Sequence, residues 1–308
     1  MNTTASLRAL LTGSVDYAGL FPPADLELEP ALQNYAAYIR DPDSWMLGGF
    51  VLPSAKFADA AASLKRCILT QSLRISALGP RTENPAQFTT ALRTVSETIR
   101  AFNAGQSDRA EVTQIEMALP AKPGVHLAEA NAILADLVLP TFWEAVPDEA
   151  ERTIGFLSER RRTGTGRFGF KLRTGGVIAS AFPSSVQIAR ALVAATQGGV
   201  PIKFTAGLHH PVRKFDPSVQ TKMHGFLNVL GAGVLAAEHE WDVQQTAHMI
   251  EDEDASAFSF EDESFTWHEW KVPTARIGAH RKIVTSFGSC SFDEPRQDLR
   301  ALNLLSSA

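Results

Sequence analysis

The chain has 308 residues, of which 44% are hydrophobic and 20% are charged, and its formal net charge is −5. These values are typical of a globular protein with a large core. The negative net charge gives no basic field to attract phosphate backbones, so we expect no nucleic-acid partner. The two cysteines, Cys67 and Cys290, form no CxxC pair, which favours a reducing cytoplasm over secretion.

The apolar segments of the sequence are too short to predict a membrane span. The N-terminal MNTTASLRALLTGS has a short apolar run but no cleavage-site pattern, so we predict no signal peptide. The apolar stretch at 226–241 ends in charge before it reaches the roughly 18 residues that a span needs. We therefore expect a cytoplasmic protein with no membrane partner. The sequence leaves open whether the chain forms a homo-oligomer.

Short apolar runs that end in proline or glycine alternate with longer segments of helical periodicity. The predicted strands are 15–23, 46–53, 73–80, 112–120, 140–147, 167–176, 200–208 and 282–291. The predicted helices are 29–39, 55–68, 84–102, 126–138, 151–162, 184–196 and 293–305. Eight cycles of this alternation predict an α/β fold of the (β/α)8 TIM-barrel type, with an open doubly wound sheet as the alternative.

One segment, about 211–281, is longer than a plain barrel unit requires. Helical patterns at 218–241 and 242–255 are followed by a mixed acidic and aromatic run at 258–278. We interpret the segment as a helical and loop insertion between the seventh and eighth strands, within one domain that spans 1–308. It would cover the barrel mouth or form a subunit contact.

The sixth and seventh predicted strands each carry a lysine inside an apolar run. Because alternate residues of a strand share a face, Lys171 points the same way as Arg173, and Lys203 the same way as Thr205. Burying an unpaired ammonium group is costly, so a lysine that faces a core needs a partner or a function. We interpret these faces as pointing into the barrel, near the strand ends where barrel enzymes hold their catalytic groups.

Two glutamates lie at a similar height near the ends of the fourth and fifth predicted strands. Glu116 stands in QIEMALP and Glu144 in FWEAVP. Four adjacent strands would place two carboxylates and three cations in one cavity. The alternative interpretation is a buried ion network that only fills the barrel.

Two lysines in one dry pocket have a specific chemical consequence. Each disfavours the charge of the other, and burial disfavours both charges, so one amine can become neutral near physiological pH. A neutral amine attacks carbonyl carbons, and a nearby carboxylate can move the protons that imine formation requires. The pattern therefore predicts Schiff-base chemistry on a small molecule, with no cofactor and no bound metal.

Several segments resemble, in chain order, the deoxyribose-phosphate aldolase family of class I aldolases. The most specific is KLRTGG at 171–176, which matches the family's Lys-x-x-Thr-Gly at Lys171, Thr174 and Gly175. The other segments, each given with its family pattern, are VDYAGLFPPA (IDHTLLKP, with Asp16), GFVLPSAKFADAAASL (the second strand and its helix), EMALP (DVVFP, with Glu116), IKFTAGL (IKASGGI, with Lys203 and Gly207) and FGSCS (GTSS, with Gly288, Ser289 and Ser291).

The resemblance implies an aldolase-type TIM barrel with lyase activity. By that resemblance Lys171 would form the imine, Lys203 would lower the pKa of Lys171, and Glu116 would serve in the proton relay. The predicted catalytic residues are therefore these three. The predicted substrate-binding residues are Asp16, Glu144, Arg173, Thr174, Thr205, His209, His210, Ser289 and Ser291.

The sequence departs from the family pattern where that family binds phosphate. Arg173 replaces a small polar residue, and GLHHP at 207–211 replaces GGIR. Asp293 and Glu294 open the last predicted helix, where they would repel a phosphate that the helix dipole attracts. We therefore expect a carboxylated or unphosphorylated carbonyl substrate.

Two other functions remain open from the sequence. A metal-dependent barrel lyase or hydrolase would use Glu116 and Glu144 with His209 or His210, a carboxylate and imidazole set that suits zinc or manganese. A barrel without catalytic activity would bind an anionic metabolite through Arg173 and the two lysines. The two histidines are equally consistent with loop residues that hydrogen-bond to the backbone.

Overall fold

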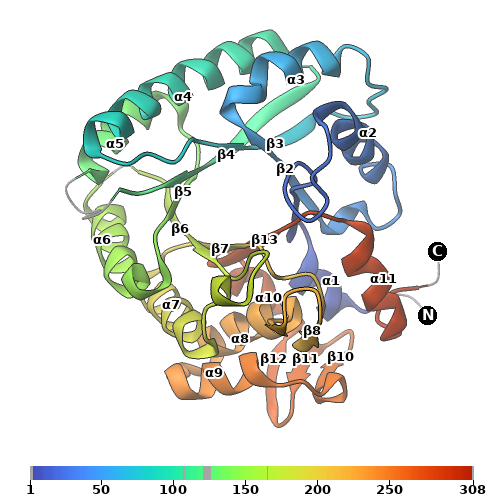
Figure 1. Cartoon of the computed structure of the whole chain (residues 1–308). Helices are drawn as coiled ribbons and strands as arrows, with labels where there is room; N and C mark the ends of the chain where they lie inside the picture. The colour runs from blue at the N-terminus through green and yellow to red at the C-terminus, as the bar shows by residue number, and fades with distance from the viewer. Residues whose placement is uncertain (1–2, 107, 121–125, 165, 307–308) are drawn as a thin grey trace.

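Eight parallel strands close into a barrel in the computed structural model, which describes residues 3–106, 108–120, 126–164 and 166–306 (Figure 1). The barrel strands are β1 (Val15–Tyr17), β2 (Leu47–Pro53), β3 (Leu73–Leu78), β4 (Ala110–Ala118), β5 (Thr141–Glu144), β6 (Phe168–Arg173), β7 (Ile202–Thr205) and β13 (Val284–Ser289). They pair in chain order, and β13 closes the barrel against β1. The predicted TIM barrel is confirmed, and each predicted strand segment overlaps one barrel strand.

Helices surround the barrel on its outer side (Figure 1). They are α2 (Leu28–Tyr38), α3 (Phe57–Leu64), α4 (Pro85–Gln106), α5 (Leu127–Leu134), α6 (Ala150–Thr163), α7 (Ser185–Gly198), α8 (Phe226–His239) and α11 (Asp293–Ala301). Local sequence sets their ends, as at α7, which begins at a capping box formed by Ser184 and Gln187 and ends at Gly199 in the left-handed region. A further helix, α1 (Ala5–Leu11), precedes β1 and was not predicted.

The barrel strands are buried on both faces, as a parallel sheet covered by helices requires. All residues of β6 from Phe168 to Leu172 are buried. Lys171 faces inward, where it meets Glu116, so alternation turns Phe170 and Leu172 outward toward the helices. The same strand therefore supplies both an apolar layer for the core and an ionisable layer for the barrel interior.

The segment between β7 and β13 contains five short strands as well as helices. In chain order it forms the hairpin β8 (Lys214–Asp216) and β9 (Thr221–Met223), then α8, α9 (Val243–Glu251), the antiparallel strands β10 (Phe258–Phe260), β11 (Ser264–Trp267) and β12 (Trp270–Pro273), and α10 (Thr274–His280). The helical prediction for 218–241 is therefore wrong over β9. The acidic and aromatic run forms a small sheet, because its apolar side chains alternate over three or four residues at a time.

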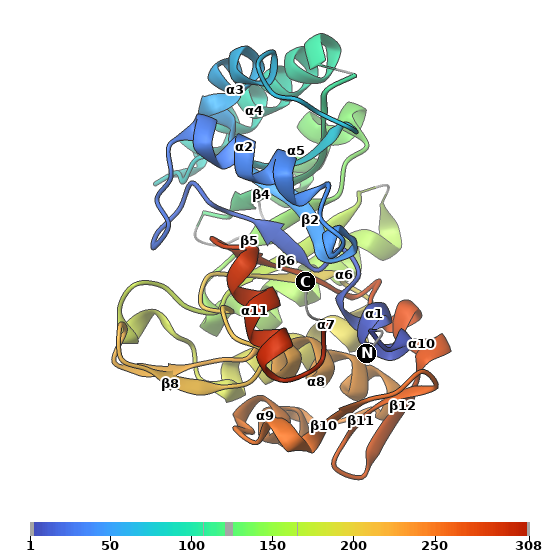
Figure 2. The same ribbon diagram turned by 90° about the vertical axis from the view of Figure 1, so that its right-hand side faces the viewer.

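Helix α8 takes the place of the seventh barrel helix, and the rest of the segment packs around it. All residues of α8 from Phe226 to Ala236 are buried, because α7, α9, β12 and β13 contact it from different sides. The three-stranded sheet also contacts α1. Figure 2 shows α1 and the β8–β9 hairpin on opposite sides of the barrel. Within the described ranges, no helix has both the length and the apolar character that crossing a membrane requires.

Candidate active site

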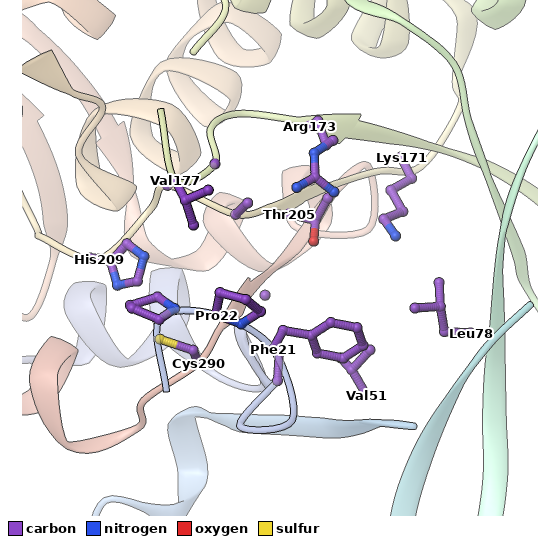
Figure 3. Close-up of a pocket in the computed structure, with 16 residues that line it drawn as sticks. Phe21, Pro22, Val51, Leu78, Lys171, Arg173, Val177, Thr205, His209 and Cys290 are labelled. Carbon is purple, nitrogen blue, oxygen red and sulfur yellow. The ribbon is translucent and has the colours of Figure 1, made fainter. Parts of the chain in front are cut away.

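A cavity of about 260 Å³ lies at the C-terminal ends of the barrel strands (Figure 3). Six residues of the predicted site and motifs line it, namely Lys171, Arg173, Thr205, Gly207, His209 and Gly288. Sequence reasoning missed the apolar wall, which is formed by Phe21, Pro22, Pro23, Val51, Leu78 and Val177. These residues lie at or near the ends of strands β1, β2, β3 and β6, and only that position could have indicated them.

Lys171 lies at the cavity between two carboxylates. Its Nζ is 2.8 Å from Glu116 Oε2 and 3.0 Å from Glu144 Oε2. Strand register explains the second contact, since Lys171 pairs directly with Glu144 on β5 and with Lys203 on β7. Only 4% of Lys171 is exposed, yet it lines the cavity, whereas Lys203 does not.

Lys203 lies deeper and is also held by two carboxylates. Its Nζ is 2.7 Å from Asp16 Oδ2 and 2.5 Å from Glu116 Oε1. The two oxygens of Glu116 thus bridge the two lysine amines. The strands β4 to β7, which are neighbours in the barrel, bring Glu116, Glu144, Lys171 and Lys203 together as predicted. Asp16 joins them from β1, which β13 separates from β7.

Asp16 is fixed by hydrogen bonds rather than free for a ligand. Its carboxylate accepts from Gly49 N–H (2.7 Å), Ser286 Oγ (2.8 Å) and Gln114 Nε2 (3.3 Å). A Cβ on Gly48 would lie 2.3 Å from Asp16 Oδ1, so the glycine leaves room for the carboxylate. Asp16, predicted to bind the substrate, lies beneath the cavity and does not line it.

The charges of the network balance. Three carboxylates (Asp16, Glu116 and Glu144) face Lys171, Lys203 and the mostly exposed Arg81, which pairs with Glu144. Burial raises the pKa of Glu116, but the two ammonium groups outweigh burial and hold it well below its ordinary range. Likewise burial lowers the pKa of Lys203, but Asp16 and Glu116 outweigh burial and raise it. The mutual repulsion of the lysines, which the sequence suggested, is thus countered at Lys203 by its carboxylate partners.

The remaining motif residues shape the loops around the cavity. Thr174 is fully buried, and its Oγ donates to Ala206 O at 2.6 Å. Gly207 has φ +75°, and a Cβ there would lie 2.8 Å from Gly175 Cα, so the loops after β6 and β7 meet through two glycines. Ser289 Oγ donates to Ser291 O at 2.6 Å. Neither Thr174 nor Ser289 lines the cavity, so the structure gives these two residues no direct place at a substrate.

The two histidines after β7 point to different surroundings. His209 lines the cavity, and its Nδ1 lies 2.9 Å from Glu294 Oε2. His210 is buried, and its Nδ1 lies 2.6 Å from Asp298 Oδ2 on α11. Burial lowers the pKa of His209, but hydrogen bonds to Cys290 and Glu294 outweigh burial and raise it to about 10. His209 is therefore an imidazolium cation at neutral pH, whereas His210 links the β7 loop to the last helix.

The raised pKa of His209 predicts a pH-dependent stability contribution. A group whose pKa is higher in the folded state stabilises the fold fully below its unfolded pKa, here 6.5, and loses that contribution as pH rises toward 10. We expect the difference in unfolding free energy between wild type and His209→Gln to shrink between these two pH values. Urea titrations at pH 6, 8 and 10 measure it. A difference between wild type and His209→Gln that stays constant over this range would contradict the charged pair. So would a difference between wild type and Glu294→Gln that does not shrink over the same range.

The predicted metal set does not converge. Glu116 and Glu144 are occupied by lysines, and the nearest ring nitrogens of His209 and His210 face Glu294 and Asp298. Across the part of the chain that the structure describes, no three His, Cys, Asp or Glu side chains form a group that could hold a metal ion. The geometry of these residues gives the metal-dependent alternative no support.

The site and fold define a (β/α)8 barrel with an ionised interior and a small cavity at the C-terminal strand ends. No family model and no curated protein matches the chain. Among solved structures, the chain is similar to dihydropteroate synthase from Xanthomonas albilineans in complex with 7,8-dihydropteroate. The identity is 11% and the TM-score 0.41, with 96% of this chain and 94% of that chain covered. A likeness with this identity and TM-score supports no conclusion about the function of the chain.

Proposed function

We propose that this protein is a class I, aldolase-type lyase that forms a Schiff base between Lys171 and a small, unphosphorylated carbonyl compound. One observation carries the proposal: Lys171 is the amine of the two-lysine network that reaches the cavity. The groups that such chemistry needs lie beside Lys171. Two carboxylate oxygens lie within 3.0 Å of its Nζ, and Lys203, the second cation, shares Glu116 with it.

The proposed reaction begins with the loss of a proton from Lys171 to Glu116 or Glu144. The free electron pair on Nζ then forms a bond to the carbonyl carbon, and the π electrons of the C=O bond move to oxygen. That oxygen takes one proton from Nζ and one from the carboxylic acid formed in the first step, and it leaves as water while the nitrogen electron pair forms the C=N bond of an iminium ion. Lys203 stays charged between Asp16 and Glu116 and so keeps a cation in the network throughout the reaction.

The iminium ion then serves as the electron sink for carbon–carbon bond chemistry. In the cleavage direction, the bond between the α and β carbons breaks, its electron pair forms an enamine, and the β-hydroxyl proton leaves to give a carbonyl product. Protonation of the enamine and addition of water release the second product and restore Lys171. Glu116 is the proposed proton carrier, because it contacts both amines.

The surroundings of α11 support an unphosphorylated substrate. Asp293 accepts a hydrogen bond from Tyr38 at 2.8 Å and pairs with Arg296, and Glu294 pairs with His209. The Glu294 N–H already donates to Ser291 Oγ at 3.1 Å. The start of this helix thus presents carboxylates, where a phosphate would need free N–H donors.

Borohydride trapping tests the proposal. Incubation with short aldehydes or oxo acids and borohydride should give a reduced adduct, and peptide mass spectrometry should locate it on Lys171. Exposed lysines such as Lys222 serve as the internal control for unspecific labelling. A panel that labels Lys171 no faster than Lys222 would contradict the proposal.

The complete pairing of both lysines also favours a second candidate, a barrel that binds an anionic metabolite without turnover. A fully satisfied ion network is stable without any reaction to perform. This candidate predicts ligand affinity with no Lys171 adduct and no product, so the same trapping experiment separates the two.

A further inference from the structure

The charged side chains that line the cavity are all basic. Among the described residues that line it, Lys171, Arg173 and His209 carry positive groups, and none is an aspartate or glutamate. The rest of the lining is largely apolar, with Phe21 and Leu78 facing Lys171 and Arg173 across the cavity in Figure 3. A molecule that fills this space meets basic side chains on one side and an apolar surface on the other.

The three cations differ in how their charge is compensated. Lys171 lies between two carboxylates, and His209 pairs with Glu294. Arg173 is exposed, and within the described ranges no hydrogen bond or ion pair involves its guanidinium group. The charge of Arg173 acts on Glu144, but that carboxylate already pairs with Lys171 and Arg81. Arg173 is thus the cation of the cavity that has a charge available for a ligand.

The position of Arg173 ties this charge to the reactive amine. Arg173 lies two residues beyond Lys171 on β6, on the same face and nearer the mouth, and pairs with Thr205 on β7. A two-residue step along a strand is about 6.6 Å. Figure 3 shows both side chains directed into the cavity. A small molecule in a cavity of about 260 Å³ can therefore contact both groups at once.

We infer that the substrate is an oxo acid, whose carboxylate binds Arg173 while its carbonyl carbon faces Lys171 Nζ. This inference rests on the proposed function and adds the substrate class to it. The planar guanidinium group donates two parallel hydrogen bonds to a carboxylate, which gives orientation as well as affinity. A carboxylate contact accounts for the arginine two residues beyond the reactive lysine, where the family that the sequence resembles has a small polar residue.

A phosphate is the competing anion, and the structure favours a carboxylate. A phosphate site usually adds backbone N–H groups of a helix start to its basic side chains. Here the start of α11 carries Asp293 and Glu294, and the Glu294 N–H is already used by Ser291. Arg173 alone suits a planar, singly charged carboxylate.

The first experiment compares matched carbonyl compounds in the trapping reaction. The pairs are butanal with 4-oxobutanoate and butan-2-one with 2-oxobutanoate, so that each acid has a neutral counterpart of the same chain length. In wild type we expect the acid of at least one pair to label Lys171 at least about tenfold faster than its neutral counterpart does. A factor of this size corresponds to one charge-assisted hydrogen-bonded contact. Arg173→Gln should remove that preference and leave the neutral compound unchanged. Arg190→Gln, an exposed arginine on α7 outside the cavity, is the control.

The second experiment measures binding without any reaction. Butanoate has no aldehyde or ketone carbon to attack, so its affinity, measured by calorimetry or ligand-observed NMR, reports on carboxylate binding without a reaction. Wild type and Arg190→Gln should bind butanoate at least about tenfold tighter than Arg173→Gln does. Methyl phosphate is the competing probe, and tighter Arg173-dependent binding of methyl phosphate would overturn the carboxylate assignment.

The two experiments separate the inference from the proposed function. If Lys171 is labelled but Arg173→Gln keeps the preference of wild type, the oxo-acid assignment fails and the Schiff base stands. If butanoate binds through Arg173 while no carbonyl compound labels Lys171, the carboxylate site stands and the proposed reaction fails. If Arg173→Gln changes neither labelling nor binding, the inference is wrong.

Discussion

Replacing Lys171 with arginine is expected to abolish borohydride trapping and to lower turnover of any accepted carbonyl compound by at least about 10³-fold. A guanidinium group stays protonated at all accessible pH values, so it has no electron pair to attack carbon. It keeps a positive charge opposite Glu116 and Glu144, so the ion network is preserved. The measurement is the rate of adduct formation together with product formation, with circular dichroism to show that the variant is folded.

Lys203→Arg is the matched comparison, because it makes the same change at the neighbouring amine. In the proposed function Lys203 acts only through its charge, and arginine keeps that charge. We expect Lys171 to be trapped in this variant, at a rate reduced about tenfold to a hundredfold by the altered position of the cation. If Lys203→Arg loses the adduct completely while Lys171→Arg retains one, the roles of the two lysines are the reverse of those proposed.

Most of the barrel could be predicted from the sequence, because its strands are buried on both faces and its helices on one. Strands that are buried on both faces give continuous apolar runs such as β2, and helices that are buried on one face give helical periodicity such as that of α7. The small sheet β10–β12 was not predicted, since its strands have only three or four residues and carry charged residues between them. Tertiary contacts with α1 and α8 stabilise these strands, and local sequence does not record such contacts.

The cluster of ionisable residues could also be predicted, but its pairing could not. Alternation along each strand was enough to turn Lys171, Lys203 and Glu116 toward one interior. Which oxygen meets which amine depends on register and on distances across the barrel, which no spacing in the sequence encodes. Arg81 illustrates the point: it follows β3 in a loop, and its contact with Glu144 on β5 reaches across the end of β4.

The motif residues show a second limit of the sequence. Thr174 and Ser289 match positions in the resembling family, yet both hydroxyl groups donate to backbone carbonyls of nearby loops. Loop direction decides whether such a side chain points into a cavity or back to the chain, and residue type does not. His209 and His210 are adjacent in sequence, but one lines the cavity and the other is buried against α11.

Lys203→Met is expected to lower the free energy of unfolding by roughly 3–5 kcal/mol at pH 7. Lys203 is 1% exposed and contacts Asp16 and Glu116, which are equally buried. Methionine fills a similar volume but leaves two carboxylates without their shared cation, and an uncompensated buried charge is strongly unfavourable. Urea denaturation measures the loss. Lys222→Met removes an exposed lysine paired with Glu253, and should cost less than about 1 kcal/mol.

The pH dependence of this loss distinguishes a charge effect from a packing effect. In wild type the pKa of Glu116 is lower in the folded state than its unfolded value of 4.5, so the ionised carboxylate stabilises the fold at pH values above 4.5. This contribution is lost as the pH falls through the folded pKa. Lys203→Met removes part of that contribution, so the stability difference from wild type should narrow as pH falls below about 4.5. A difference that is the same at pH 7 and pH 4 would mean that methionine disturbs packing alone. Adding Asp16→Asn to Lys203→Met should recover part of the loss, because the second change removes one of the two unpaired charges.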